Sequence, residues 1–494
     1  MIKRILLISV LAVLAVVAIL VSRTLGMESL QGTADNTPAQ SVEIDPEAAI
    51  ERFAGAIRIP TISFENVEDT DSASFRTLHD YFEVTYPRVH QTLTREIVAG
   101  LSLLYTWEGT ETALAPVVLM GHQDVVPVIP GTEEDWTHPA YAGVIDDEYI
   151  WGRGTMDDKV SVVAILEAVE ALLTEGYQPR RTLYLAFGHD EEVGGVRGAA
   201  QIAQVLEARG AEPYAFVVDE GGAVTRDMVP GVEGAVALVG IAEKGYVNIE
   251  LLVEGGGGHS STPPANTNIG ILAEAISELE ENPFPARLEG AARSMFDYLA
   301  PEMSFGAKMA FANLWLLEPV VTWALVADPS SASMVRTTTA VTIIEGGVKA
   351  NVLPISARAI VNHRIVPGET RETVLERVRT VIDDERVQVS VHGEEAVDPS
   401  PVSDPTGEAF QMLAGTIRQV MAGEEVVVAP YLVMGGTDAK YYSGRSPNVF
   451  RFLPAPMEAD ALQRVHGTNE RMSIAGFIAS IQFFQQLIRN SDGL

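Results

Sequence analysis

Five short segments of the sequence contain the His, Asp and Glu residues that a site for two metal ions needs. They lie at residues 121–124, 154–159, 190–194, 218–221 and 466–468. Two imidazoles and three carboxylates can hold a pair of zinc-like ions when one carboxylate bridges them, and a further carboxylate nearby can transfer protons. The pattern predicts a hydrolase with the metal ligands His122, Asp157, Glu192, Asp219 and His466.

His122 and Asp124 are two residues apart, so in an extended chain both side chains point to the same side. Asp124 can then accept a hydrogen bond from the imidazole and fix its tautomer, which leaves the other ring nitrogen for a metal ion. A lone His-x-Asp pair would more often be a surface pair, and its assignment here depends on the other four segments.

Asp157 and the acidic run at 190–192 supply the remaining carboxylates of this group. Asp157 opens a helix after a glycine-containing turn, and we expect it to bridge the ions; ordinary helix capping is the alternative. Three carboxylates after an apolar stretch are electrostatically costly without cations, unless they form a solvated turn. Adjacent side chains diverge, so we assign Glu192 to metal and Glu191 to the base.

Two further residues are candidates for contact with a substrate. His259 follows four glycines and could donate a hydrogen bond to a developing oxyanion, although a structural loop is the alternative. Arg364 has the shape to grip a carboxylate with two hydrogen bonds, although a surface ion pair is its ordinary role.

Apolar, β-rich runs precede three of the motifs, at 117–120, 182–187 and 216–218, and helix-like stretches alternate with them. This alternation is typical of parallel βαβ units. Because ligands bind at the carboxyl ends of such strands, we expect the three motifs to meet at one edge of a mostly parallel sheet flanked by helices.

The chain of 494 residues is too long for one core. We predict an α/β catalytic domain from residues 45–243 and 394–494. An inserted α+β lid, ferredoxin-like in its order of strands and helices, occupies 244–393. The strongly apolar stretch 294–328 does not fit the lid pattern. It is either extra core or a subunit contact, or else a wall for a long acyl chain or a surface that touches a bilayer.

The N-terminus carries Lys3 and Arg4 before an apolar run at 5–21. A membrane anchor, a cleaved signal and a buried helix all fit; the poor cleavage site favours the anchor within residues 1–26. The flanking charges place the catalytic part outside the cytoplasm, in the periplasm if the source is bacterial; cleavage would make the protein secreted. The polar stretch 27–44 is predicted to be a linker that lifts the enzyme off the membrane.

The composition restricts the partners and the metal sites that this chain can have. A net charge of −33 argues against nucleic acid as a partner. The absence of cysteine excludes disulfides and thiolate metal sites.

The segments 121–128, 151–159, 188–195, 257–261 and 466–470 together resemble the aminoacylase/carboxypeptidase family of di-zinc hydrolases. They are most similar to its branch of carboxypeptidase S and the N-fatty-acyl-amino-acid synthase/hydrolases. The resemblance implies two zinc ions per subunit, with cobalt or manganese as alternatives. It places one ion on His122, Asp157 and Asp219 and the other on Asp157, Glu192 and His466. It also implies a cis peptide bond after Asp157.

The same resemblance implies hydrolysis of N-acyl amino acids or C-terminal peptide bonds, by a metal-bridged water that Glu191 activates. His259 and Asn351 would reach the substrate from the lid, in many relatives from a partner's lid, so a homodimer is one expectation. Arg364, Asn351 and the Gly436 backbone would hold the substrate carboxylate. The alternatives are a dipeptidase without acyl preference and a non-catalytic, membrane-tethered binding protein, against which the intact Glu191 argues.

Overall fold

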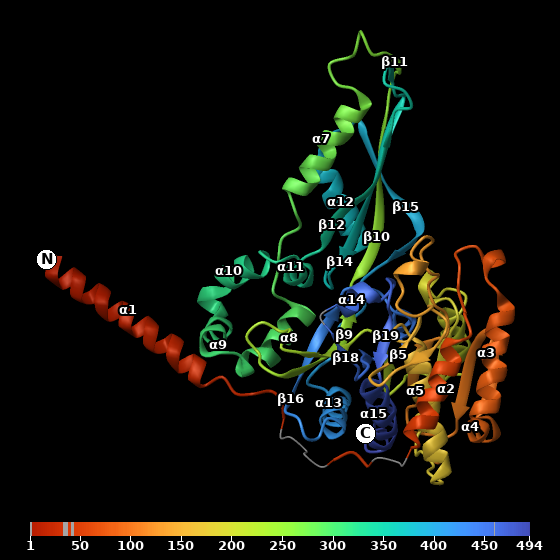
Figure 1. The fold of residues 1–494 in the computed structure, drawn as a ribbon. Coiled ribbons are helices and arrows are strands. Elements are labelled where there is room, and N and C mark those ends of the chain that lie inside the picture. Colours follow the sequence, from red (N-terminus) through yellow and green to blue (C-terminus); the bar gives the residue numbers. More distant parts are fainter. Residues whose placement is uncertain (1, 33–37, 41–43, 459) are drawn as a thin grey trace.

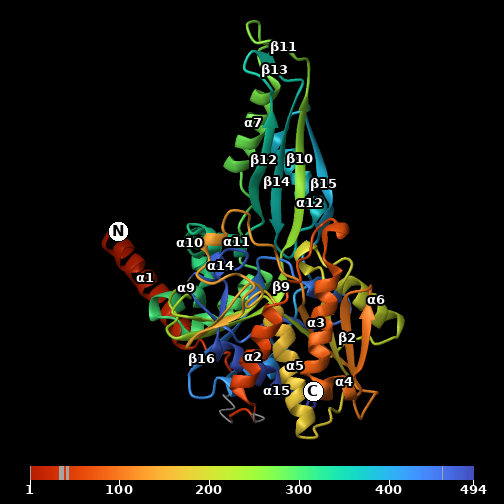
Figure 2. The same cartoon turned by 45° about the vertical axis from the view of Figure 1, so that its right-hand side comes forward.

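The computed structural model describes residues 2–32, 38–40, 44–458 and 460–494. Figure 1 shows a broad main body, a narrower lid that rises from it, and an N-terminal helix that projects from the side. The same three parts are separate in the view turned by 45° (Figure 2).

A mixed sheet of ten strands forms the centre of the main body. Its order is β1-β2-β6-β3-β7-β17-β9-β8-β18, with β16 paired to β9. The central strands β6, β3, β7 and β17 are parallel to one another, as are β16 and β9. The bounds are β1 (Thr94–Val98), β2 (Ser102–Trp107), β3 (Val117–His122), β6 (Leu183–Gly188), β7 (Phe216–Asp219), β8 (Ala223–Arg226), β9 (Ala235–Glu243), β16 (Val426–Val433), β17 (Val449–Arg451) and β18 (Pro456–Met457). The predicted mostly parallel sheet is confirmed.

Helices cover both faces of this sheet, and the alternation of β3 shows how. Leu119 packs in the core that contains α5, whereas Val118 and Met120 pack in a second core that contains α6. Because side chains alternate along a strand, an apolar run such as this one is buried on both faces. The helices are α2 (Pro46–Ile57), α3 (Ser72–Thr85), α4 (Pro87–Thr92), α5 (Lys159–Thr174), α6 (Ala199–Ala208), α13 (Glu408–Val420) and α15 (Ile474–Ser491).

The lid is a separate antiparallel sheet with the order β12-β14-β10-β15 and its own hydrophobic core. Its elements are β10 (Gly245–Glu254), α7 (Asn268–Glu281), β12 (Thr338–Gly346), β14 (Ser356–Ile365), α12 (Arg371–Ile382) and β15 (Val387–Val397). The predicted strand and helix order is confirmed. At the far end of the lid, β11 (Gly258–His259) pairs with β13 (Val352–Leu353).

One part of the segment that we assigned to the lid packs elsewhere. The helices α8 (Gly290–Leu299), α9 (Phe305–Ala312), α10 (Leu314–Leu325) and α11 (Pro329–Val335) lie between two lid elements in sequence. Their buried side chains, such as Met295 and Leu299, nevertheless join the core of the main body. The chain leaves the lid after α7, packs against β16, and returns to the lid at β12.

Residues 27–32 and 38–40 do not form the spacer that we expected. The Gln31 side chain accepts a hydrogen bond from the Val428 N–H at 2.8 Å and donates to the Tyr298 carbonyl at 3.3 Å. The Gln40 N–H donates to the side chain of Gln486 at 2.7 Å. Because these contacts hold both pieces against the main body, the end of helix α1 (Ile2–Leu25) lies close to it. The rest of the predicted linker lies outside the described residues.

Candidate metal centre and active site

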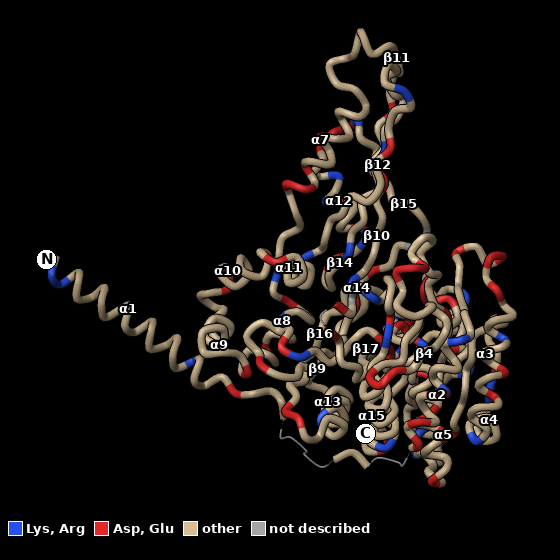
Figure 3. Tube along the Cα trace, in the orientation of Figure 1, with Lys and Arg blue, Asp and Glu red and all other residues tan. Residues whose placement is uncertain are grey.

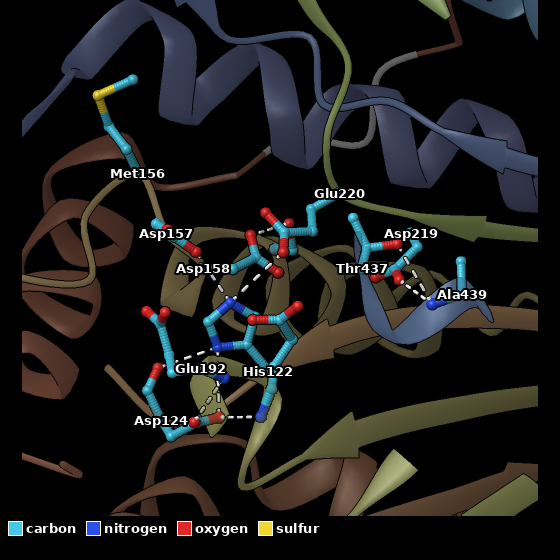
Figure 4. A network of polar contacts seen from close by, with 12 residues as sticks. His122, Asp124, Met156, Asp157, Asp158, Glu192, Asp219, Glu220, Thr437 and Ala439 are labelled. Carbon is cyan, nitrogen blue, oxygen red and sulfur yellow. Dashed lines mark hydrogen bonds and ion pairs between the residues drawn. The ribbon is translucent and has the colours of Figure 1, made fainter. Parts of the chain in front are cut away.

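The candidate site lies where three neighbouring parallel strands end. β3 ends at His122, β7 ends at Asp219, and β6 leads through a short loop to the turn at Glu191–Val193. The strand order β6-β3-β7 places these ends side by side. The segments therefore meet at one edge of the sheet, as expected, and Figure 4 shows their side chains around His122.

His122 is held in one orientation by Asp124. Its Nδ1 lies 3.0 Å from the Asp124 carbonyl oxygen and 3.3 Å from the Asp124 Oδ1. The Asp124 carboxylate is buried and is itself held in place, because the Ser63 hydroxyl donates to it at 2.5 Å and the N–H groups of Glu191 and Glu192 donate at 3.2 Å. This arrangement leaves Nε2 facing the other acidic side chains, as a metal-ligating histidine requires.

Asp157 lies between the two expected histidines. Its Oδ1 is 2.9 Å from His122 Nε2, and its Oδ2 is 3.0 Å from His466 Nε2. His466 Nε2 is also 3.0 Å from Glu192 Oε2. The peptide bond between Asp157 and Asp158 is cis, as the family resemblance predicts. A carboxylate with one oxygen directed at each imidazole has the geometry of a bridging ligand.

The structure differs from the sequence-based expectation at Asp219. Asp219 points away from His122, and its Oδ2 accepts a hydrogen bond from the Ala439 N–H at 2.7 Å (Figure 4). The next residue, Glu220, turns toward the site, and its Oε1 is 3.5 Å from His122 Nε2. The cause is the alternation of side chains along β7. Val217 packs with Ala439 in the core on the α6 side, and Asp219, two residues later, therefore points to the same side of the sheet.

A buried ion pair joins the loop of Asp157 to the loop of His466. Glu470 accepts hydrogen bonds from the N–H groups of Gly154, Met156 and Asp157 at 3.0, 2.8 and 3.2 Å. Its other oxygen pairs with Arg153 at 2.5 Å. The Arg153 guanidinium also donates to the Gly467 carbonyl at 2.7 Å. Both ion-pair partners are buried, so this pair fixes two ligand-bearing loops that are far apart in sequence.

The concentration of acidic side chains in this cluster favours the binding of cations. Burial raises the pKa of Glu191 well above its usual range, and burial together with nearby Asp157 raises the pKa of Glu220 to about 7. Hydrogen bonds to Asp157 and Glu192 raise the pKa of His466 to about 10. The carboxylates thus repel one another and draw protons onto the imidazoles, a cost that divalent cations would remove.

The donor atoms also suit a metal of the zinc type. In two sets of three side chains the ligand atoms lie within 4.8 Å of one another. One set is His122, Glu191 and Glu220, and the other is His122, Asp157 and Glu192. The buried Glu192 Oε1 has no hydrogen-bond partner among the described residues. Imidazole nitrogen and carboxylate oxygen are the ligands that zinc takes in the absence of cysteine. The side chains of this cluster therefore fit metal ions of the zinc type.

His259 and Asn351 are not part of this cluster within one chain. His259 is exposed in β11 at the far end of the lid, with its Nδ1 2.8 Å from the Ser261 hydroxyl. Asn351 lies beside it, and its carbonyl accepts from the Ser260 N–H at 3.3 Å. The two residues are neighbours at the tip of the lid.

Arg364 and Gly436 lie at the base of the lid and on the main body. The Arg364 guanidinium stacks over the Tyr246 ring, 4.7 Å from its centre. Gly436 is exposed in the loop that follows β16, near Glu243. Neither residue contacts the metal-ligand cluster directly.

An apolar cavity of about 120 Å³ opens beside the carboxylates of the site. It reaches Asp157, Asp158 and Glu220, and its other walls are mainly apolar. Those walls are formed by Met156, Gly221, Gly222, Ala223, Leu453, Ala455, Pro456, Met457, Val465 and Met472. The apolar stretch 294–328 contributes no wall to this cavity.

Sequence reasoning missed Glu220, Ser63 and the pair formed by Glu470 and Arg153. Glu220 stands in one of the five acidic or His-containing segments, and strand alternation was the signal that could have separated it from Asp219. Glu470 and Arg153 also lie in segments that carry the family resemblance, but their pairing joins loops 317 residues apart and has no local signal. Ser63 lies outside all of the motifs.

The sequence and the fold both match known proteins. Residues 118–490 match the model of peptidase family M20/M25/M40. Probable carboxypeptidase S-like 2 of Dictyostelium discoideum is 42% identical over 90% of this chain and 85% of its own length. N-fatty-acyl-amino acid synthase/hydrolase PM20D1 of Homo sapiens is 38% identical over 97% of this chain and 96% of its own.

Carboxypeptidase S of Saccharomyces cerevisiae is 36% identical over 90% of this chain and 84% of its own. Among solved structures, the M20 family metallo-carboxypeptidase Sso-CP2 from Sulfolobus solfataricus has the same fold. Its TM-score is 0.64 at 18% identity, and the match covers 90% of this chain and 99% of that one. The chain therefore belongs to peptidase family M20/M25/M40 and is a metal-dependent hydrolase.

Proposed function

We propose that this enzyme is a two-metal amidohydrolase that cleaves N-acyl amino acids or C-terminal peptide bonds. The observation that carries the proposal is Asp157, whose two oxygens each face a different imidazole. One ion would be held by His122, Asp157 and Glu220, and the other by Asp157, Glu192 and His466. Zinc fits these ligands best, with cobalt and manganese as alternatives.

In the proposed mechanism Glu191 moves the proton. Bound metal ions of this kind lower the pKa of water and polarise a carbonyl oxygen. Burial raises the pKa of Glu191, so this carboxylate can accept a proton from the attacking water and deliver it to the departing amine. Asp124 keeps the His122 ring in place throughout. Arg364, Asn351 and the Gly436 backbone would hold the carboxylate of the substrate.

The apolar cavity supports an apolar group on the substrate. It adjoins Asp157 and Glu220, the side chains that flank the proposed reaction centre. The human and yeast relatives carry the names of an N-fatty-acyl-amino acid synthase/hydrolase and of a carboxypeptidase, which fit acyl and peptide substrates respectively. A dipeptidase without acyl preference is the second candidate, and a series of N-acyl chain lengths separates the two.

Glu191→Gln tests the proposal. We expect turnover of N-acyl amino acids to fall by about 10²–10⁴-fold because the amide cannot accept the proton. Metal content, measured by plasma emission spectrometry, should stay at two ions per chain. Glu134→Gln, at an exposed position on the main body, is the control and should keep full turnover. Near-normal turnover of the Glu191 variant would remove Glu191 from this role.

We also propose that a second copy of the chain completes the site. His259 and Asn351 lie at the lid tip, where a partner could receive them. Co-expression of Glu191→Gln chains with His259→Ala chains tests this. Mixed dimers should regain activity that neither variant has alone, because one of the two sites then combines an intact Glu191 with an intact His259. Failure of this mixture to regain activity would contradict the shared site.

Helix α1 is long and apolar enough to cross a membrane and lies near the N-terminus, where it could be a signal anchor or a signal peptide. We propose that it is retained as an anchor, with the enzyme outside the cytoplasm. The support is that Arg23 and the end of this helix contact the main body.

A further inference from the structure

Helix α10 presents an apolar face to the outside of the molecule. Trp315, Leu316, Val320 and Trp323 are 57%, 44%, 60% and 71% exposed. Their spacing places them on one side of the helix, together with the exposed Pro319. This face carries no charged residue, although the chain as a whole is strongly acidic.

The opposite face of α10 packs against the main body. Leu314 and Val321 are buried in the core of the main body. Glu318, the charged residue of this helix, is exposed, but it follows Leu314 by four positions and therefore lies at the edge between the buried side and the apolar face. The packing thus fixes the apolar face outward, and an exposed apolar surface of this kind usually marks a contact with a partner or a membrane.

The end of helix α1 lies beside α9 and the start of α10. The Asn313 side chain, between α9 and α10, donates to the Leu20 carbonyl at 3.1 Å, and the Arg23 side chain donates to the Ala312 carbonyl at 3.2 Å. Figures 1 and 2 both show α9 and α10 beside this end of α1. In Figure 3 the length of α1 between its ends carries no charge, and α10 is almost free of it.

These contacts set the level of a bilayer relative to the main body. A membrane that accepts α1 must have its surface near the last turns of that helix, because Arg23 is charged. The Leu20 contact places the start of α10 at this level. Tryptophan and tyrosine are enriched at the membrane–water boundary, and α10 supplies Trp315 and Trp323.

We propose that the exposed face of α10 lies in the outer leaflet of the membrane, beside α1, so that the main body rests directly on the lipid. This inference depends on the proposed retention of α1 as an anchor. It replaces the acyl-binding interpretation of residues 294–328, because α10 contributes nothing to the cavity at the site.

The absence of cysteine allows a direct test with single spin labels. Val320→Cys reports on α10, and Val84→Cys is the matched control, 83% exposed on α3 at the opposite side of the main body. Leu11→Cys reports on α1 itself. Each full-length variant is labelled with a nitroxide and reconstituted in phosphatidylcholine vesicles. Paramagnetic resonance then compares the label's accessibility to oxygen with its accessibility to a water-soluble nickel chelate.

We expect the labels at 11 and 320 to favour oxygen over the nickel chelate, which indicates lipid, and the label at 84 to show the reverse. If the label at 11 lies in lipid and the label at 320 favours the nickel chelate, α10 does not rest on the membrane and this inference is wrong. If the label at 11 also lies in water, α1 does not act as a membrane anchor, and the inference that depends on it is wrong. If the label at 320 is shielded to a degree that depends on protein concentration, a second copy of the chain covers α10, and the inference is again wrong. Hydrolysis, measured separately, tests the proposed function alone.

Discussion

The choice between Asp219 and Glu220 as metal ligand yields a sharp prediction. The two carboxylates are adjacent, so Asp219→Asn and Glu220→Gln make the same chemical change one residue apart. Glu220 Oε1 is 3.5 Å from His122 Nε2, whereas Asp219 Oδ2 accepts the Ala439 N–H on the other side of the strand. We expect only Glu220→Gln to remove a ligand.

The size of the effect follows from the charge. A unit charge about 4 Å away contributes about 4 kcal/mol at an effective dielectric constant of about 20, and a divalent ion feels at least this loss. The affinity for one ion should therefore fall by about 10³-fold or more. An asparagine at 219 can still accept the Ala439 N–H, so the free energy of unfolding should change by no more than about 1 kcal/mol.

Metal content and activity after dialysis against a weak chelator distinguish the variants. Glu220→Gln should retain about one ion per chain and lose activity, which excess metal should partly restore. Asp219→Asn should keep two ions and near-normal turnover. The opposite result, with metal lost from Asp219→Asn and retained by Glu220→Gln, would refute the assignment of Glu220 as the ligand.

Two further predictions concern groups outside the ligand set. Glu470→Gln leaves the buried Arg153 without its carboxylate, so the free energy of unfolding should fall by about 3–5 kcal/mol in urea titrations; an unchanged midpoint would contradict this. Burial lowers the pKa of His363 in the lid to about 4, below the unfolded value of about 6.5. The unfolded state therefore binds a proton first, and stability should be full above pH 6.5 and fall by up to about 3 kcal/mol as the pH drops to 4. Hydrogen exchange of the lid amides should show this loss in the wild type and not in His363→Phe.

Much of the fold follows from local patterns. The apolar runs before His122, before the acidic turn and before Asp219 are each long enough for a strand, and the helices between them require a parallel crossover. The lid follows for the same reason, because its strands and helices alternate within short distances. Parallel topology then explains why three motifs from separate parts of the chain reach one edge of the sheet.

The rest depends on contacts that no local pattern encodes. The position of α8 against the main body is decided by β16, which lies more than a hundred residues later. The side of the strand on which Asp219 lies is decided by the layer that contains Ala439. The contacts of Gln31 with distant segments are likewise invisible in a polar stretch that has the composition of a linker.

The bond between Glu470 and the loop of Asp157 has a consequence for the order of events during biosynthesis. His466 and Glu470 follow the other groups of the site in the sequence and are therefore made long after most of its acidic residues. A nascent chain can therefore form its central strands while the site still lacks one imidazole and the clamp on Asp157. Full loading with metal must therefore wait until the segment that contains His466 and Glu470 has been made and has packed against the loop of Asp157.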